Sequence, residues 1–249
     1  MDRPGRTALR RSAQGHGHRR AAAADGIRYA VRIAKGQSMI KAVIFDMDGT
    51  IFDTEVIYEY AWKKAGVTQE QYLQLIGRGH KVNDAALSSW GMDPVRIRRI
   101  RNEYMRREIN AHGITPKPGA EETLQWLGER GIPAAIATSS PMELALEYME
   151  RTGFGRYFAG IYSGYQLERG KPAPDLFLHA ARQLGREPEE CVVVEDSCNG
   201  IRAGRNAGML TVMVPDRVPA DDEMREKADV ILDSLLLFPA WLTEQMQNT

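Results

Sequence analysis

Cysteine is scarce in this chain of 249 residues: only Cys191 and Cys198 are present. They do not form a metal-binding spacing by themselves, and reduced thiols in a cytoplasmic protein are the plain expectation. Long apolar runs are also missing, since none approaches the ~18 residues of a membrane span. Lys+Arg and Asp+Glu both number 33, so no excess charge points to nucleic acid or to an anionic membrane. The sequence therefore predicts a soluble globular protein.

Residues 1–38 differ from the rest because they contain few acidic side chains and lack an apolar period. They are rich in Arg, Ala and Gly, a composition faintly similar to that of a transit peptide. His16 and His18 are possible metal ligands, but an unstructured tail explains them better. We expect a disordered extension, or one that is not translated because synthesis starts at Met39.

The segment Lys41–Thr50, KAVIFDMDGT, contains an apolar run that ends in two carboxylates. Such a run predicts a strand buried on both faces, with its carboxyl end at the sheet edge where α/β proteins bind ligands. In an extended segment Asp46 and Asp48 point the same way and repel each other unless a cation lies between them. Mg²⁺ suits such a site, whereas an Asp-rich turn is the plainer alternative.

Residues 55–114 predict an all-helical insert, because helical apolar periods are separated there by glycines. The helix containing Val95 to Ile109 is rich in arginine, and a solvated helix face is the expected role of its Arg cluster. A Gly-rich basic loop at 77–81 contains His80, which is a candidate substrate contact. An exposed turn between helices is an equally good interpretation of that loop.

After residue 115, predicted strands and helices alternate, which indicates a parallel sheet covered on both faces. One predicted strand, 132–137, ends at Thr138-Ser139, where hydroxyl and backbone N–H groups suit a phosphate oxygen. Lys171 stands between Gly and Pro, which favours a fixed cation. A second apolar strand ends in the acidic pair Glu195-Asp196.

These four segments, in this order, resemble those of the haloacid dehalogenase-like hydrolases, in the branch with a helical cap after the first strand. The resemblance implies a Rossmann-like α/β core formed by residues 39–54 and 115–249, with a cap at 55–114. It also implies Asp46 as nucleophile, Asp48 as acid and base, and Mg²⁺ as cofactor. The implied site residues are Asp46, Asp48 and Asp196 for the metal, Lys171 for catalysis and substrate, and Thr138, Ser139 and His80 for substrate.

The activity that this resemblance implies is hydrolysis of a small phosphorylated metabolite, a sugar phosphate or nucleoside monophosphate, through an aspartyl-phosphate intermediate. Dehalogenases dispense with the metal and the second aspartate, so Asp48 and Asp196 favour phosphate. A β-phosphoglucomutase-like isomerase is the alternative, although Tyr58 stands where that mutase has a cap histidine. Some segments are similar to pseudouridine 5′-phosphatases, and a non-catalytic phosphate sensor is a third interpretation. We expect a cytoplasmic monomer with no nucleic-acid or membrane partner.

Overall fold

The computed structural model describes residues 39–247. The expectations for residues 1–38, including a tail and the start at Met39, therefore concern a segment outside the described part. Within the described range, no helix is long and apolar enough to cross a membrane.

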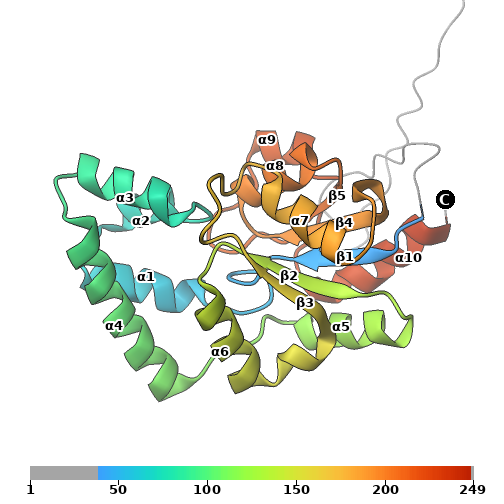
Figure 1. The fold of residues 1–249 in the computed structure, drawn as a ribbon, viewed down its shortest axis with the longest axis horizontal. Coiled ribbons are helices and arrows are strands. Elements are labelled where there is room, and N and C mark those ends of the chain that lie inside the picture. Colours follow the sequence, from blue (N-terminus) through green and yellow to red (C-terminus); the bar gives the residue numbers. More distant parts are fainter. Residues whose placement is uncertain (1–38, 248–249) are drawn as a thin grey trace, which may run out of the picture.

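A sheet of six parallel strands forms the centre of the molecule, in the order β3-β2-β1-β4-β5-β6 (Figure 1). The first strand in sequence is central, so residues that follow it lie at the middle of the sheet edge. This topology confirms the predicted Rossmann-like α/β class. The strands are β1 (Ala42–Phe45), β2 (Ala134–Thr138), β3 (Phe158–Ser163), β4 (Cys191–Glu195), β5 (Leu210–Met213) and β6 (Val230–Ile231).

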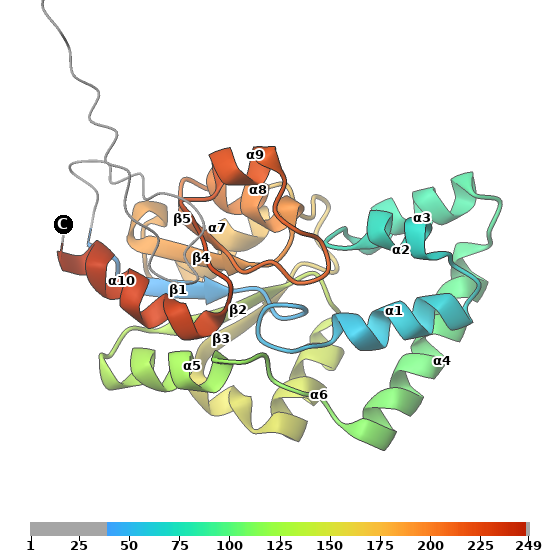
Figure 2. The same ribbon diagram turned by 180° about the vertical axis from the view of Figure 1, so that it is seen from behind.

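Alternate side chains of the central strands enter two separate apolar layers. In β1, Val43 and Phe45 join one buried cluster, while Ala42 and Ile44 join the other. This period of two explains why β1 needs an uninterrupted apolar sequence. The first cluster is covered by α5 (Ala120–Glu129), α6 (Met142–Thr152) and α10 (Phe238–Gln247), and the second by α7 (Asp175–Gln183) and α8 (Cys198–Asn206), with α9 (Asp222–Lys227) beside α8 (Figure 2).

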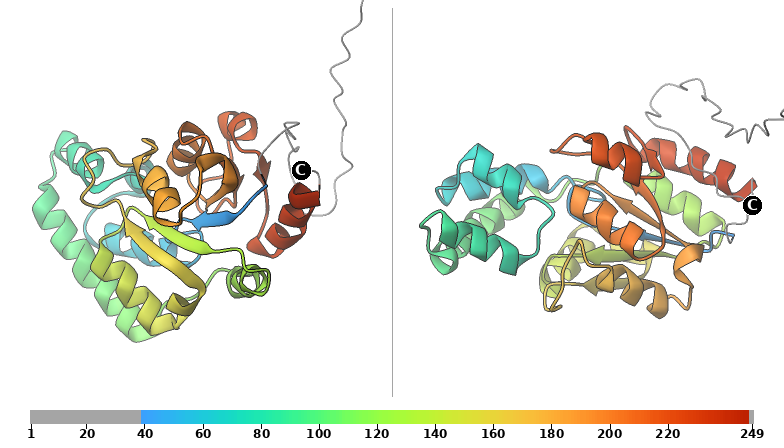
Figure 3. Two further views of the ribbon diagram at one scale, coloured as in Figure 1. Left: turned by 45° about the vertical axis from the view of Figure 1, so that its right-hand side comes forward. Right: turned by 90° about the horizontal axis from the view of Figure 1, so that it is seen from above.

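Four helices form a lobe beyond the carboxyl ends of the strands (Figure 3). They have an apolar cluster of their own, in which Trp62, Tyr72 and Leu87 are buried. Asp93 caps the longest helix, because its carboxylate accepts the backbone N–H groups of Val95 and Arg96. The helices of this lobe are α1 (Glu55–Lys64), α2 (Gln69–Leu75), α3 (His80–Ser89) and α4 (Pro94–His112).

The two connections between this helical lobe and the sheet run side by side. The amide of Asp53 donates to the carbonyl of Thr115 at 2.8 Å, and Phe52 forms an antiparallel bridge with Pro116. The chain therefore leaves the sheet and returns to it at nearly the same place.

Candidate active site

A cavity of about 630 Å³ lies between the carboxyl ends of the strands and the helical lobe. Asp46, Asp48, Lys171 and Asp196 line it from the sheet side. Asp46 and Asp48 follow β1, Asp196 follows β4, and Lys171 lies in the connection after β3, and the parallel topology brings these three segments to one edge. The cavity therefore contains the main polar residues that the sequence singled out.

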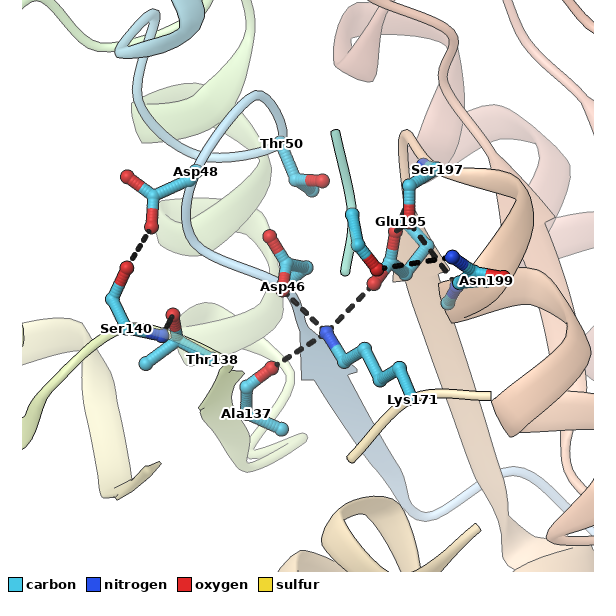
Figure 4. Close-up of polar contacts among 12 residues, drawn as sticks. Asp46, Asp48, Thr50, Ala137, Thr138, Ser140, Lys171, Glu195, Ser197 and Asn199 are labelled. Atoms are coloured by element: carbon cyan, nitrogen blue, oxygen red, sulfur yellow. Dashed lines mark hydrogen bonds and ion pairs between the residues drawn. The ribbon is translucent and has the colours of Figure 1, made fainter. Parts of the chain in front are cut away.

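Lys171 is the cation at the base of this cavity, and all three of its N–H groups have acceptors (Figure 4). Its Nζ lies 2.5 Å from Asp46 Oδ1, 2.7 Å from Glu195 Oε1 and 3.1 Å from the carbonyl oxygen of Ala137. Burial lowers the pKa of Lys171, but the Asp46 and Glu195 carboxylates outweigh it and raise the pKa overall. The side chain is therefore a fixed positive charge.

Glu195, one of the two acids that hold Lys171, is itself oriented by the start of α8. Glu195 Oε2 accepts the backbone N–H and the hydroxyl of Ser197, both at 2.9 Å, and Ser197 Oγ in turn caps α8 by accepting the Gly200 N–H. A Cβ on Gly200 would lie 1.8 Å from the Glu195 carboxyl group, so this position requires glycine.

Asp46 and Asp48 do not point the same way, contrary to the expectation from an extended segment. Strand β1 ends at Phe45 and the chain bends at Met47, so the alternation of a strand does not continue to Asp48. Asp46 faces Lys171, whereas the Asp48 carboxylate accepts the hydroxyls of Thr54 and Ser140, each at 2.7 Å (Figure 4).

Burial raises the pKa of both aspartates. The pKa of Asp46 reaches about 8, because burial and the nearby Glu195 and Asp48 carboxylates outweigh the attraction of Lys171. Burial also raises the pKa of Asp48, and the hydrogen bonds from Ser140 and Thr54 oppose this rise. A carboxyl group with a raised pKa can carry a proton near neutral pH.

Asp196 contributes a further buried carboxylate beside Asp46. Its Oδ1 accepts the Thr50 hydroxyl at 3.2 Å, and no Lys or Arg of residues 39–247 forms an ion pair with it. Burial, Glu195 and Asp46 raise its pKa well above the ordinary value. A Cβ on Gly49, which has a φ of 81°, would lie 2.5 Å from Asp196 Oδ2, so glycine lets the loop after β1 approach it.

This donor set fits a magnesium ion. Asp46, Glu195 and Asp196 bring three buried carboxylates together against one lysine, an imbalance that a divalent cation would relieve. No cluster of three or more His, Cys, Asp or Glu side chains suited to a metal occurs among the described residues. Mg²⁺ needs no such cluster, because it usually keeps several waters and takes only one or two carboxylates with substrate oxygens.

Thr138 and Ser139 also line the cavity, at the end of β2. Thr138 Oγ1 accepts the backbone N–H of Ser140 at 3.0 Å, which closes a tight turn before α6. From this segment, the hydroxyl that contacts Asp48 is that of Ser140, a residue that the sequence did not single out as part of the site. Ser140 could not be separated from Ser139 by sequence alone, since the two are adjacent and identical.

From the lobe side, His80 lines the same cavity and stacks on Tyr165, with ring centroids 4.1 Å apart. The loop before it lies against the start of α8, where Asn199 Nδ2 donates to the Gly77 carbonyl at 3.3 Å. The arginine cluster of α4 was expected to be solvated, but Arg101 is half-buried and its guanidinium lies over the Trp62 ring. The spacing of the arginines in the sequence does not reveal that Arg101 is half-buried rather than solvated.

Comparison with known proteins identifies the family. The model of the haloacid dehalogenase-like hydrolases matches residues 40–208. Hexitol phosphatase A of Escherichia coli is 33% identical over 203 residues, which cover 78% of this chain and 91% of that protein. Fructose-1-phosphate phosphatase YqaB of the same organism is 33% identical over 181 residues, which cover 69% of this chain and 95% of that protein.

A solved structure of β-phosphoglucomutase from Clostridium difficile has the same fold. Its TM-score is 0.71 at 26% identity, and the match covers 84% of this chain and 98% of that one. The family match extends over every segment that lines the sheet side of the cavity, from β1 to the start of α8. The chain therefore belongs to the haloacid dehalogenase-like hydrolase family.

Proposed function

We propose that this protein is a Mg²⁺-dependent phosphatase of small phosphomonoesters, such as sugar phosphates or nucleoside monophosphates. The observation that carries this proposal is the pair of aspartates at the end of β1, one held by Lys171 and the other by two hydroxyls. Hexitol phosphatase A and the fructose-1-phosphate phosphatase, both similar over most of the chain, support small phosphorylated carbohydrates as the substrate class.

In the first step, the Asp46 carboxylate attacks phosphorus and forms an aspartyl phosphate while the bond to the leaving oxygen breaks. Lys171 holds Asp46 in place and offers a positive charge beside the transferred group. Asp48 donates its proton to the leaving oxygen, for which its raised pKa is suitable.

In the second step, water attacks the aspartyl phosphate, Asp48 takes the proton from that water, and inorganic phosphate leaves with Asp46 restored. Thr138 and Ser139 would contact the phosphoryl oxygens through their hydroxyl and backbone N–H groups, since both line the cavity. Asp48 acts in both steps, which explains why two hydroxyl groups hold its carboxylate at the cavity wall.

Magnesium would be held by the carboxylates of Asp46 and Asp196 and by the backbone carbonyl of Asp48. When bound, the ion supplies positive charge that neutralises the phosphoryl oxygens and favours ionised Asp46. Thr50 would orient Asp196 through its hydroxyl group.

We further propose that residues 39–54 and 115–249 form the catalytic core and that the lobe at 55–114 acts as a cap. Paired connections at Asp53 and Thr115 would allow the cap to move over the cavity and limit access by water. His80, which lines the cavity from this lobe, would contact the substrate.

The experiment is phosphate release, with Mg²⁺ and with EDTA, from fructose 1-phosphate, sorbitol 6-phosphate and pseudouridine 5′-phosphate. Asp46→Asn removes the nucleophile, and Asp222→Asn is the matched control because Asp222 is exposed on α9. Metal-dependent release that Asp46→Asn abolishes and Asp222→Asn retains is the expected result. Release unchanged in Asp46→Asn would refute the proposal.

Two other outcomes correspond to the alternatives. Interconversion of β-glucose 1-phosphate and glucose 6-phosphate without phosphate release would make the protein a mutase, the activity in the name of the similar Clostridium difficile protein. Neither activity in a folded, Mg²⁺-binding chain would favour a phosphate sensor. The sensor is the weaker candidate, because Asp46, Asp48, Lys171 and Asp196 are all present at one cavity.

A further inference from the structure

Tyr58 of α1 begins a chain of hydroxyl groups that ends at Asp48, the proposed acid and base. Its hydroxyl oxygen lies 3.3 Å from Ser140 Oγ, and Ser140 Oγ donates to Asp48 Oδ2 at 2.7 Å (Figure 4 shows the second of these contacts). Tyr58 belongs to the helical lobe, whereas Asp48 and Ser140 follow β1 and β2. All three residues line the cavity. Tyr58 therefore reaches Asp48 through one intervening hydroxyl group.

The protons that are available fix the direction of these hydrogen bonds. An ionised Asp48 carboxylate can only accept, so the single proton of the Ser140 hydroxyl is donated to Asp48. The Tyr58 hydroxyl must then donate to Ser140, because Ser140 has no second proton to offer. Burial and the charge of Asp48 raise the pKa of Tyr58, so the tyrosine keeps its proton near neutral pH. Tyr58 is therefore a permanent donor to Ser140.

The backbone of Ser140 is held on both sides. Its N–H donates to Thr138 Oγ1 at 3.0 Å, and its carbonyl accepts the Ser163 hydroxyl at 2.6 Å. Since the backbone is fixed, the direction of the Ser140 hydroxyl depends on its contacts with Tyr58 and Asp48. Hydrogen bonds in such a chain polarise and strengthen one another. The Tyr58 bond, at 3.3 Å, is longer than a usual O–H···O bond, so its effect should be modest.

We propose that Tyr58 is a positioning residue, which fixes the Ser140 hydroxyl and thereby orients Asp48 for proton transfer to the leaving oxygen. This inference rests on the proposed phosphatase function, since it takes Asp48 as the acid. Packing alone and direct contact with the substrate are the competing explanations, because Tyr58 packs against the apolar cluster of the lobe and lines the cavity. The leaving group distinguishes these roles, because only proton transfer depends on the basicity of the leaving oxygen.

The test compares two substrates with different leaving groups. The first is the carbohydrate phosphate hydrolysed fastest in the assay described above, whose alkoxide needs a proton as it leaves. The second is 4-nitrophenyl phosphate, whose leaving group needs none because the nitro group stabilises the negative charge. The constant measured, with Mg²⁺, is kcat/KM, which reports the stabilisation of the transition state relative to free enzyme and substrate.

The variants are Tyr58→Phe, Ser140→Ala and the double variant with both changes. Tyr60→Phe is the matched control, because Tyr60 is exposed on the same helix and does not line the cavity. Each substitution of tyrosine by phenylalanine removes one hydroxyl group and keeps the ring. Thermal melting of every variant checks that the kinetics are measured on folded protein.

We expect Tyr58→Phe to lower kcat/KM about 5-fold for the carbohydrate phosphate and less than about 2-fold for 4-nitrophenyl phosphate. In the Ser140→Ala background, Tyr58→Phe should cause less than about 1.5-fold further loss, because the two hydroxyls act as one unit. Tyr60→Phe should leave kcat/KM unchanged for both substrates.

An equal loss with both substrates would assign Tyr58 to packing or to substrate binding and would overturn the inference. So would an unchanged kcat/KM in Tyr58→Phe, or a full additional loss in the double variant, because Tyr58 would then act without Ser140. A wild type that hydrolyses both substrates, with no selective effect of Tyr58→Phe, would refute only the role of Tyr58. A wild type that releases phosphate from none of the carbohydrate phosphates would refute the proposed function itself.

Discussion

Glu55 offers a sharp test of how the helical lobe is held, because it is a buried carboxylate at the start of α1. The Tyr72 hydroxyl of α2 donates to the Glu55 carboxylate. The same hydroxyl oxygen also lies 3.1 Å from the backbone carbonyl oxygen of Glu55. Burial, opposed by the bond from Tyr72, raises the pKa of Glu55 from 4.5 to about 7. This contact joins two helices of the lobe, so its strength should depend on pH.

The direction of the pH dependence follows from the linkage between proton binding and folding. Because the folded-state pKa lies above the unfolded value, the stability that Glu55 contributes is complete below pH 4.5 and is lost as the pH rises through about 7. A rise of this size corresponds to about 3 kcal/mol. Glu55→Gln keeps an acceptor for Tyr72 and has no charge to bury. We therefore expect the variant to match the wild type near pH 4.5 and to exceed its free energy of unfolding by up to about 3 kcal/mol at pH 8.

The assay is urea unfolding followed by far-ultraviolet circular dichroism between pH 4.5 and 8.5, in EDTA. Glu59→Gln is the control, since Glu59 lies one turn further along α1, is half-exposed and is 3.8 Å from Arg217. We expect the control to change stability by less than about 1 kcal/mol at every pH. A difference between Glu55→Gln and wild type that stays constant with pH, or a less stable variant at pH 8, would refute the reasoning.

Three further predictions concern the cavity. Ser140→Ala removes a hydrogen-bond donor that lowers the pKa of Asp48. The basic limb of the pH profile of kcat/KM should therefore move to higher pH, and kcat should fall about 10-fold. A basic limb that does not move would contradict this. Gly200→Ala should cost more than about 2 kcal/mol in urea unfolding because its Cβ meets a buried carboxyl, whereas Gly128→Ala, with nothing within 4 Å, should stabilise α5 by about 0.5–1 kcal/mol; equal effects would refute the steric argument. Saturating Mg²⁺ should raise Tm, with about 2.7 kcal/mol gained at a hundredfold excess over Kd, and Asp196→Asn should remove the rise; an intact rise in the variant would exclude Asp196 as a ligand.

Much of the fold could be predicted from sequence because the pattern of the core is local. The apolar run before Asp46 has the composition of a strand buried on both faces, and alternation with helices indicates a parallel sheet. The element boundaries were predicted less accurately. The strand predicted to start at Ile132 begins at Ala134 instead, because Pro133 has no backbone N–H to donate to a neighbouring strand. Only its carbonyl takes part in the pairing, by accepting the N–H of Val43.

The contacts within the site depend on residues far apart in sequence, and these could not be predicted. Asp48 turns toward Ser140, a residue 92 positions away, because the chain bends after β1. The partnership of Glu195 with Lys171 likewise needs the two segments to meet in space. The sequence identified the edge of the sheet where the polar residues gather, but the direction of each side chain came from tertiary packing.

The adjacent connections at Asp53 and Thr115 have a consequence for how such a protein can change over evolution. One hydrogen bond of 2.8 Å joins Asp53, where the chain leaves the sheet, to Thr115, where it returns. For the geometry of the sheet, the whole intervening segment is therefore equivalent to a short surface loop. Closing a loop costs little more when it grows longer, so an entire helical module can be lengthened, rebuilt or exchanged without altering strand register. The chemistry proposed for the end of β1 and the substrate contacts proposed for the lobe can therefore diversify as separate inheritable units.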